Sequence, residues 1–284
     1  MLSPVGRLFA VLCFALAGGT IATGAHAENA LRLGLLPYIS PRQLVETYKP
    51  LKMHLEQTLN RPVILETARN FSEFALSATR YEYDIYYAPP HFALLAEQES
   101  GYRRLAKFSV ALYGAVLVRK DGPVQEPAEL RNRKIAMPDF TAAVTFLGES
   151  WLRDEGLTPG QDVHVEYFVS HSNALMAVLN RSADAAVLAP SINRATPPNQ
   201  RENLRELART ASVARTMFMA SPKLAEEEYQ QIRLAMLAFT PQGTGKDFFA
   251  RTGYGDINEI TDADMDSVRG FIPLLKSRSQ HKNN

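Results

Sequence analysis

The chain has 284 residues, of which 46% are apolar, 21% charged and 9% aromatic, and its formal net charge at pH 7 is +1. This balance excludes a disordered chain, which would be poorer in apolar residues and further from neutrality. It also argues against a nucleic-acid-binding protein, which usually carries a basic surplus. Because 284 residues are many for one hydrophobic core, we expect two domains.

Residues 1–27 have the composition of a secretory signal peptide. One charge, Arg7, precedes an apolar stretch at 8–17, and residues 25–27 (Ala-His-Ala) match a small-x-small cleavage site. The alternative is a membrane anchor, but the apolar stretch is shorter than the roughly 20 residues that a spanning helix needs. We therefore predict cleavage after Ala27, export to the periplasm and no membrane insertion of the mature chain.

The one cysteine, Cys13, lies inside this predicted signal peptide. A lipoprotein would need a box of small residues before that cysteine, and Leu12 breaks it. The mature chain would then have no thiol, which excludes disulfides, thiolate metal sites and a cysteine nucleophile. A chain of this length can bury a core without cross-links.

Strand and helix patterns alternate through the first part of the mature chain. Leu31–Leu36 predicts a strand, and Ser40-Pro41 marks a helix start, with serine as N-cap and proline in the first turn. That helix should kink or restart at Pro50. The elements expected after it are a strand at 62–65, a helix at 71–78, a strand at 83–88, a helix at 91–98, and strands at 104–108 and 112–119.

A strong turn signal, Lys-Asp-Gly-Pro at 120–123, lies near the middle of the chain. The elements expected after it are strands at 134–137, 163–168, 185–189 and 216–220, and helices at 144–155, 173–179, 224–239, 245–252 and 261–275. Strands that alternate with helices of this length predict an α/β fold.

The predicted architecture is an α/β protein of two lobes, each a mostly parallel sheet flanked by helices, with a ligand cleft between them. Lobe 1 is expected to hold 28–120 plus 213–284, and lobe 2 to hold 121–212. We expect the hinge near 118–122 and 210–216. In open parallel sheets a ligand binds beyond the carboxyl ends of the strands, which here places the site in the cleft.

Residues directly after the predicted strands are the candidates for the cleft. Helix N-termini at this edge offer unpaired N–H groups and a partial positive charge, which suit an anion. Hydroxyls that follow strands add donors, a histidine adds a donor at either ring nitrogen and a charge if its pKa is raised, and tyrosines add a ring face and a phenol. The residues selected in this way are Tyr38, Tyr87, Pro89, Thr141, Ser170, His171 and Ser191. Each serine or threonine among them can also be a plain helix N-cap.

Each candidate motif for catalysis or metal binding in this sequence lacks a residue that its chemistry requires. The glycines at 243 and 245 hint at a phosphate loop. That loop needs a glycine at position 240, which is Thr240, and a serine or threonine at position 247, which is Asp247. The aspartates at 262–266 lack the turn glycine and last ligand of a calcium loop. No zinc motif and no nucleophile elbow occurs. None of these motifs therefore singles out a reaction, and we expect no catalytic residues, no metal and no cofactor; an exported hydrolase is the weaker hypothesis.

The order of the segments resembles the phosphonate-binding (PhnD-like) family of periplasmic solute-binding proteins. The resemblance covers nearly all of 30–275 and rests on several stretches together, which are 31–37, 48–51, 83–89, 116–121, 130–136, 170–171 and 177–186. It implies a type 2 periplasmic binding fold that closes on a small oxyanion of the phosphate, phosphite or phosphonate class. It also implies delivery of that anion to an ABC permease in the inner membrane.

The resemblance also adds Ala142 to the candidate site. In the family, a Ser-Thr-Ser-Gly-like turn at a helix N-terminus grips the phosphorus oxygens, and the matching stretch here is Thr141-Ala142-Ala143-Val144, which keeps one hydroxyl. Relatives that bind an aminoalkyl phosphonate place an acidic residue near Pro190-Ser191, and this chain has none there. The alternative function is a ligand sensor that binds a non-phosphorus anion and docks on a membrane sensor kinase.

Overall fold

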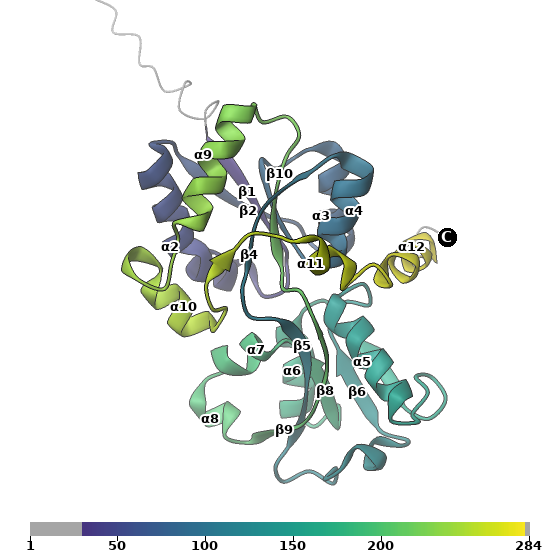
Figure 1. The fold of residues 1–284 in the computed structure, drawn as a ribbon. Coiled ribbons are helices and arrows are strands. Elements are labelled where there is room, and N and C mark those ends of the chain that lie inside the picture. The colour runs from purple at the N-terminus through teal and green to yellow at the C-terminus, as the bar shows by residue number, and fades with distance from the viewer. Residues whose placement is uncertain (1–29, 282–284) are drawn as a thin grey trace, which may run out of the picture.

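The structure, a computed structural model, describes residues 30–281 and contains two β-sheets, each with helices packed around it (Figure 1). The first sheet has the spatial order β11-β4-β10-β3-β1-β2 and the second has the order β7-β6-β8-β5-β9. The strands of the first sheet are β1 (Leu31–Leu35), β2 (Val63–Thr67), β3 (Ile85–Ala88), β4 (Arg103–Phe108), β10 (Met217–Ala220) and β11 (Ile257–Asn258). Those of the second are β5 (Leu112–Arg119), β6 (Lys134–Met137), β7 (His164–Tyr167), β8 (Ala185–Leu188) and β9 (Leu204–Val213).

The helices divide between the two sheets, so the molecule has two lobes (Figure 1). Lobe 1 carries α2 (Pro41–Leu59), α3 (Phe71–Arg80), α4 (Pro90–Ser100), α9 (Glu226–Leu237), α10 (Lys246–Thr252), α11 (Asp262–Asp266) and α12 (Phe271–His281). Lobe 2 carries α5 (Ala143–Asp154), α6 (His171–Leu179), α7 (Pro190–Ala195) and α8 (Pro198–Arg201). The short 3-10 helices η1 (Pro127–Leu130) and η2 (Gly243–Gly245) complete the described elements. The predicted two-lobed α/β fold is confirmed.

The sheets are mixed rather than mostly parallel. β1 pairs in parallel with β2 and β3, and β6 pairs in parallel with β7 and β8. In contrast, β10 runs antiparallel to β3 and β4, and β5 runs antiparallel to β8 and β9. The short β11 also runs antiparallel to β4. The chain enters β5 and β10 directly from the other lobe, so no helical crossover precedes these two strands to impose a parallel pairing.

The first connection between the lobes lies earlier than expected. β4 belongs to the first sheet and β5 to the second, so the chain crosses at 109–111 and not near 118–122. The expected boundary at residue 120 placed 112–119 with lobe 1, whereas these residues pair with β8 and β9. The second connection, 214–216, follows β9, a strand that the sequence pattern did not predict because polar residues interrupt its apolar positions.

Local sequence explains how the elements that position the site begin. Ser40 caps α2 and forms a capping box with Gln43, which fixes the helix directly after the end of β1. The buried face of α2 carries Tyr48 and Leu51, on either side of Pro50. The helix is continuous through Pro50, so the expected restart is wrong. Packing of this buried face offsets the one hydrogen bond that proline removes.

Candidate functional site

A cavity of about 40 Å³ lies between the lobes, at the ends of β1, β3 and β8. A water molecule needs about 10–15 Å³ of such space, so the cavity has room for about three waters or for a ligand head of a few heavy atoms. We call this space the inner cavity. Its lining consists of Leu36, Tyr38, Phe71, Tyr87, Pro89, Leu112, Ala142, Val144, His171, Ala189, Ser191, Arg215, Thr216 and Tyr254.

The structure brings most of the predicted site residues to this cavity. Those that line it are Tyr38, Tyr87, Pro89, Ala142, His171 and Ser191. The hydroxyls of Thr141 and Ser170 do not reach it. The Thr141 hydroxyl donates to Asp139 Oδ1 over 2.6 Å, and the Ser170 hydroxyl caps α6 by accepting the Asn173 N–H over 3.3 Å. For these two residues the structural role of a turn or cap explains the hydroxyl.

The N-terminus of α5 meets the inner cavity without a side chain to cap it. Its N-cap residue, Ala142, makes no side-chain cap hydrogen bond, and both Ala142 and Val144 line the cavity. The main-chain N–H groups at the start of a helix have no partner within the helix and carry a partial positive charge. This helix start can therefore donate to an anion through main-chain groups, although the one hydroxyl in the turn, that of Thr141, donates to Asp139 instead.

His171 enters the inner cavity as a neutral hydrogen-bond donor. Burial lowers the pKa of His171 to about 3. The ring is therefore neutral near pH 7, whereas the sequence analysis allowed for a raised pKa and a positive charge. Its Nδ1 accepts the Ala189 N–H over 3.4 Å, which leaves the ring proton on Nε2. The main-chain N–H of His171 donates to the Tyr38 carbonyl over 3.2 Å and so joins lobe 2 to lobe 1.

A second buried histidine, His91, joins the lobes beside the cavity. It belongs to α4, and its Nε2 donates to the Thr141 carbonyl over 2.8 Å, at the start of α5. Burial lowers the pKa of His91 to about 4, and no described residue bonds its Nδ1. The sequence analysis did not select His91, because no local pattern shows that a helix side chain reaches across to the other lobe.

We expect acidification to lower the free energy of unfolding through these two histidines. In the unfolded chain each ring takes up a proton below about pH 6.5, whereas burial holds the folded pKa near 4 for His91 and near 3 for His171. The stabilisation is therefore complete above pH 6.5 and is lost as the pH falls, by at most about 1.4 kcal/mol per pH unit for each histidine. Urea unfolding at pH 7.5, 6.0 and 5.0 measures this slope.

Single substitutions separate the two contributions. His91→Gln and His171→Gln should each remove about half of the slope between pH 6.0 and pH 5.0, whatever they do to stability at neutral pH. Asn199→Gln, at an exposed position of α8 and without a titratable group, serves as the control and should leave the slope unchanged. An unaltered slope in both buried variants would contradict the assignment.

Arg215 supplies the positive charge of the inner cavity, and the sequence analysis missed it. Its side chain is 4% exposed, and it is the one charged residue in the cavity lining. Its Nε donates to the Val110 carbonyl over 2.7 Å, and its guanidinium lies 4.5 Å from the centre of the Tyr254 ring. Among residues 30–281, no carboxylate forms an ion pair with Arg215. A buried cation without an acidic partner is costly unless a ligand anion pairs with it.

Arg215 also links the two connections between the lobes through a hydrogen bond. The residue belongs to 214–216, and the carbonyl of Val110 belongs to the connection at 109–111. The only sequence signal that could have found it is an arginine two residues before the apolar strand 217–220, and lone arginines at such places are common. Its burial depends on the crossing of two segments that are about a hundred residues apart.

A row of tyrosines closes the other side of the cavity. The Tyr38 hydroxyl lies 3.1 Å from the hydroxyl of Tyr48 and 3.1 Å from that of Tyr254. Burial raises the pKa of Tyr38 and of Tyr87 well above the ordinary value, so both remain protonated donors. Tyr87 is held by a tilted ring contact, with its centroid 4.4 Å from that of Phe218. The tyrosine side chains that line the inner cavity are thus held in place by their neighbours.

The described part of the chain gives no sign of a metal centre or a membrane span. In residues 30–281, no group of three histidines, cysteines or acidic residues is placed to hold a metal ion. No helix in this range is both long and apolar enough to cross a bilayer. The predicted signal peptide at 1–27 lies outside the described residues.

Comparison with known proteins places the chain in a family. The model of the ABC transporter phosphonate periplasmic substrate-binding proteins matches residues 33–265. The chain belongs to this family. Proteins of the phosphonate-binding family are periplasmic components of ABC transporters that bind substrates, and are not enzymes.

Solved structures share the fold of this phosphonate-binding family member at low sequence identity. A binding protein component of an ABC phosphonate transporter from Pseudomonas aeruginosa has a TM-score of 0.76 at 15% identity, over 90% of this chain and 89% of that one. PhnD1 from Prochlorococcus marinus, in complex with methylphosphonate, has a TM-score of 0.78 at 14% identity, over 87% and 98%. The periplasmic aliphatic sulphonate binding protein SsuA from Escherichia coli has a TM-score of 0.63 at 13% identity, over 89% and 88%.

Proposed function

We propose that the chain captures a small oxyanion of the phosphate, phosphite or phosphonate class in the inner cavity and delivers it to an ABC permease. The observation that carries the proposal is the buried guanidinium of Arg215, which faces the space between the lobes without an acidic partner in the described chain. His171, the N-terminus of α5 and the tyrosine hydroxyls would add neutral donors around the same anion.

The proposed closure of the lobes follows from the position of these donors. Tyr38 and Tyr87 belong to lobe 1, whereas Ala142 and His171 belong to lobe 2. A ligand bonded to both sides has a higher affinity for the closed state and so shifts the equilibrium toward it. We assign the bonds of His91 and His171 to main-chain carbonyls across the cleft to the proposed closed state.

Similar structures support an anionic ligand without defining it. PhnD1 was solved with methylphosphonate, and a protein from Xanthomonas citri with a TM-score of 0.66 to this chain was solved with ATP. The similarity to SsuA makes a sulphonate the second candidate for the head group. The alternative role, docking on a sensor kinase, receives no support from the comparisons.

A thermal-shift panel on residues 28–284 tests the proposal. The panel contains phosphate, phosphite, methylphosphonate, methanesulphonate, sulphate and acetate. A true ligand at about a hundred times its Kd adds roughly 2.7 kcal/mol of stability, which raises the melting temperature of a protein of this size by roughly 5–10 °C. We expect at least one phosphorus oxyanion to give that rise and acetate to give none. A panel without any stabilising oxyanion would overturn the proposed function.

A further inference from the structure

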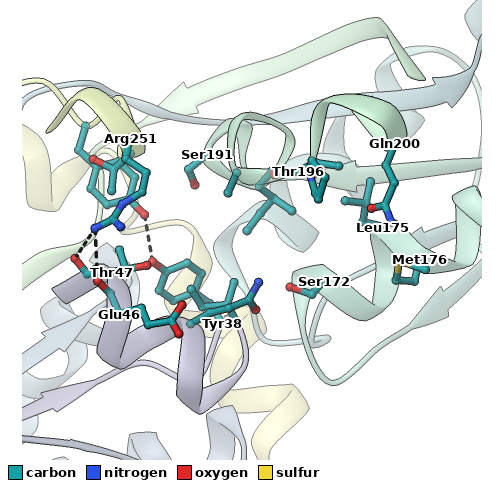
Figure 2. A pocket seen from close by; sticks show the side chains of 17 residues that line it. Tyr38, Glu46, Thr47, Ser172, Leu175, Met176, Ser191, Thr196, Gln200 and Arg251 are labelled. Carbon is teal, nitrogen blue, oxygen red and sulfur yellow. Dashed lines mark hydrogen bonds between the residues drawn. The ribbon is translucent and has the colours of Figure 1, made fainter. Parts of the chain in front are cut away.

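A second, larger pocket adjoins the inner cavity. It has a volume of about 310 Å³ and shares Tyr38, Ser191 and Tyr254 with the inner cavity, so the two spaces are neighbours. Both lobes form its walls: α2 and α10 on one side and α6, α7 and the loop before α8 on the other (Figure 2). We call this space the outer pocket.

Most of the side chains that line the outer pocket are apolar or neutral. Apolar side chains come from both lobes, with Ile39 on one side and Leu175 and Ile192 on the other. Neutral hydrogen-bonding groups stand among them. In Figure 2, Ser191 and Ser172 face Tyr38 across the space, while Thr196 and Gln200 lie on the lobe 2 side. Such a mixture suits an uncharged organic group with a few polar atoms.

The two charged residues in the outer pocket, Glu46 and Arg251, do not form an ion pair with each other. Arg251 donates to the main-chain carbonyls of Glu46 and Thr47 over 3.3 and 3.4 Å, and the carboxylate of Glu46 pairs with Arg42 (Figure 2 shows the first two bonds). Glu46 and Arg251 are exposed, so water screens both. The outer pocket therefore has no buried charge that would favour a charged part of the ligand, in contrast to the inner cavity, which has Arg215.

We propose that the ligand is an oxyanion with an uncharged organic substituent of several carbon atoms. The anionic head would occupy the inner cavity beside Arg215, and the substituent would pass Tyr38 and Ser191 into the outer pocket. The inner cavity, at about 40 Å³, accepts only a few heavy atoms, whereas the outer pocket offers about 310 Å³. A bare oxyanion would leave these apolar walls in contact with water. The inference rests on the proposed function, because it needs an anion in the inner cavity.

A chain-length series measures the use of the outer pocket. Isothermal titration with methyl-, propyl- and pentylphosphonate should show an affinity that rises by about two- to fourfold per added methylene, the gain expected for partial to full burial. An amino group at the end of the pentyl chain should weaken binding at least tenfold, because no buried carboxylate is present to pair with it. Affinity that falls with chain length, or an amino compound that binds as tightly as pentylphosphonate, would overturn the inference.

A blocking variant separates the two spaces. Ala195 is exposed on α7 and lines only the outer pocket, so Ala195→Trp should weaken pentylphosphonate at least tenfold and leave methylphosphonate unchanged. Ala263→Trp, at an exposed position of α11 away from both spaces, is the matched control and should change neither affinity. Equal affinity of Ala195→Trp and wild type for pentylphosphonate would count against the outer pocket. Binding of methylphosphonate alone would overturn this inference but not the proposed function, whereas failure of every oxyanion overturns both.

Discussion

Arg215→Met should weaken binding of the responding oxyanion by about 100-fold or more. The substitution keeps an apolar stem of similar length and removes the one cation in the lining of the inner cavity. A hydrogen bond between charged groups contributes about 1.5–3 kcal/mol, and the flat guanidinium can make two of them to one oxyanion. Loss of both corresponds to about two orders of magnitude or more in Kd. Isothermal titration with the oxyanion found in the panel measures the effect.

Three further variants test whether the expected loss of affinity is specific to the guanidinium of Arg215. Arg215→Lys keeps the charge but not the two-pronged geometry, so it should recover part of the affinity. His171→Ala removes a neutral donor and should cost about tenfold. Arg269→Met, at an exposed ion pair on the surface, should change nothing. Wild-type affinity in Arg215→Met would remove this arginine from the site and, with it, the observation on which the proposed function rests.

The melting temperature of ligand-free Arg215→Met adds an independent check. The variant loses the hydrogen bond from Nε to Val110, which destabilises the fold. It also removes a buried charge without an acidic partner, which stabilises the fold. Because the two effects oppose each other, we expect a change of less than about 3 °C, estimated at 2–4 °C per kcal/mol for this chain length. A large fall in the melting temperature would indicate that Arg215 acts mainly by linking the two connections between the lobes.

Arg278→Ala should lower the free energy of unfolding by about 2–4 kcal/mol. Arg278 lies on α12, and its guanidinium contacts both carboxylate oxygens of Glu149 on α5, at 2.7 and 2.6 Å. It also donates to the Phe140 carbonyl and lies 4.7 Å from the centre of the Phe146 ring. Glu149 has a side chain that is only 4% exposed, so the substitution leaves a buried carboxylate with weaker partners. Removing one partner of a buried ion pair costs several kcal/mol, and the remaining bonds to Glu149 reduce that figure.

The control for Arg278 is an ion pair of the same type at the surface. Arg269 pairs with Asp266, and their side chains are 61% and 59% exposed. Arg269→Ala should therefore cost less than about 1 kcal/mol. Urea unfolding of both variants at pH 7.5 measures the difference, and equal losses would show that α12 contributes no buried ion pair to lobe 2.

The α12 contact also bears on the closed state. Figure 1 shows α12 beside the upper end of α5, where the C-terminal segment meets lobe 2. Its first residue, Phe271, packs on His91 and Phe146, with ring centroids 6.0 and 5.3 Å apart. These contacts join α4 of lobe 1 to α5 of lobe 2 at the same place as the bond from His91 to Thr141. Arg278→Ala is thus expected to loosen the closed arrangement as well as the fold.

The sequence by itself determined the local elements and the edge at which the site lies. The alternation of strands and helices, the cap at Ser40 and the turn residues act over a few neighbouring positions, and such signals are readable without a structure. Pro89, His171 and Ser191 could be selected because they come soon after the end of a strand, and such residues emerge at the edge of the sheet. The resemblance to phosphonate-binding proteins rested on the order of these same local segments.

Only the tertiary structure decided which strands pair, which groups are buried and where the charge of the site comes from. The local pattern of 112–119 predicts a strand but not the sheet it joins, since that choice depends on pairing with β8 and β9 far along the chain. Arg215 becomes a buried cation because two connections cross there, and the pKa of His171 is lowered because both lobes exclude water from it. Burial and electrostatic environment are properties of segments brought together from distant parts of the chain, so no local pattern encodes them.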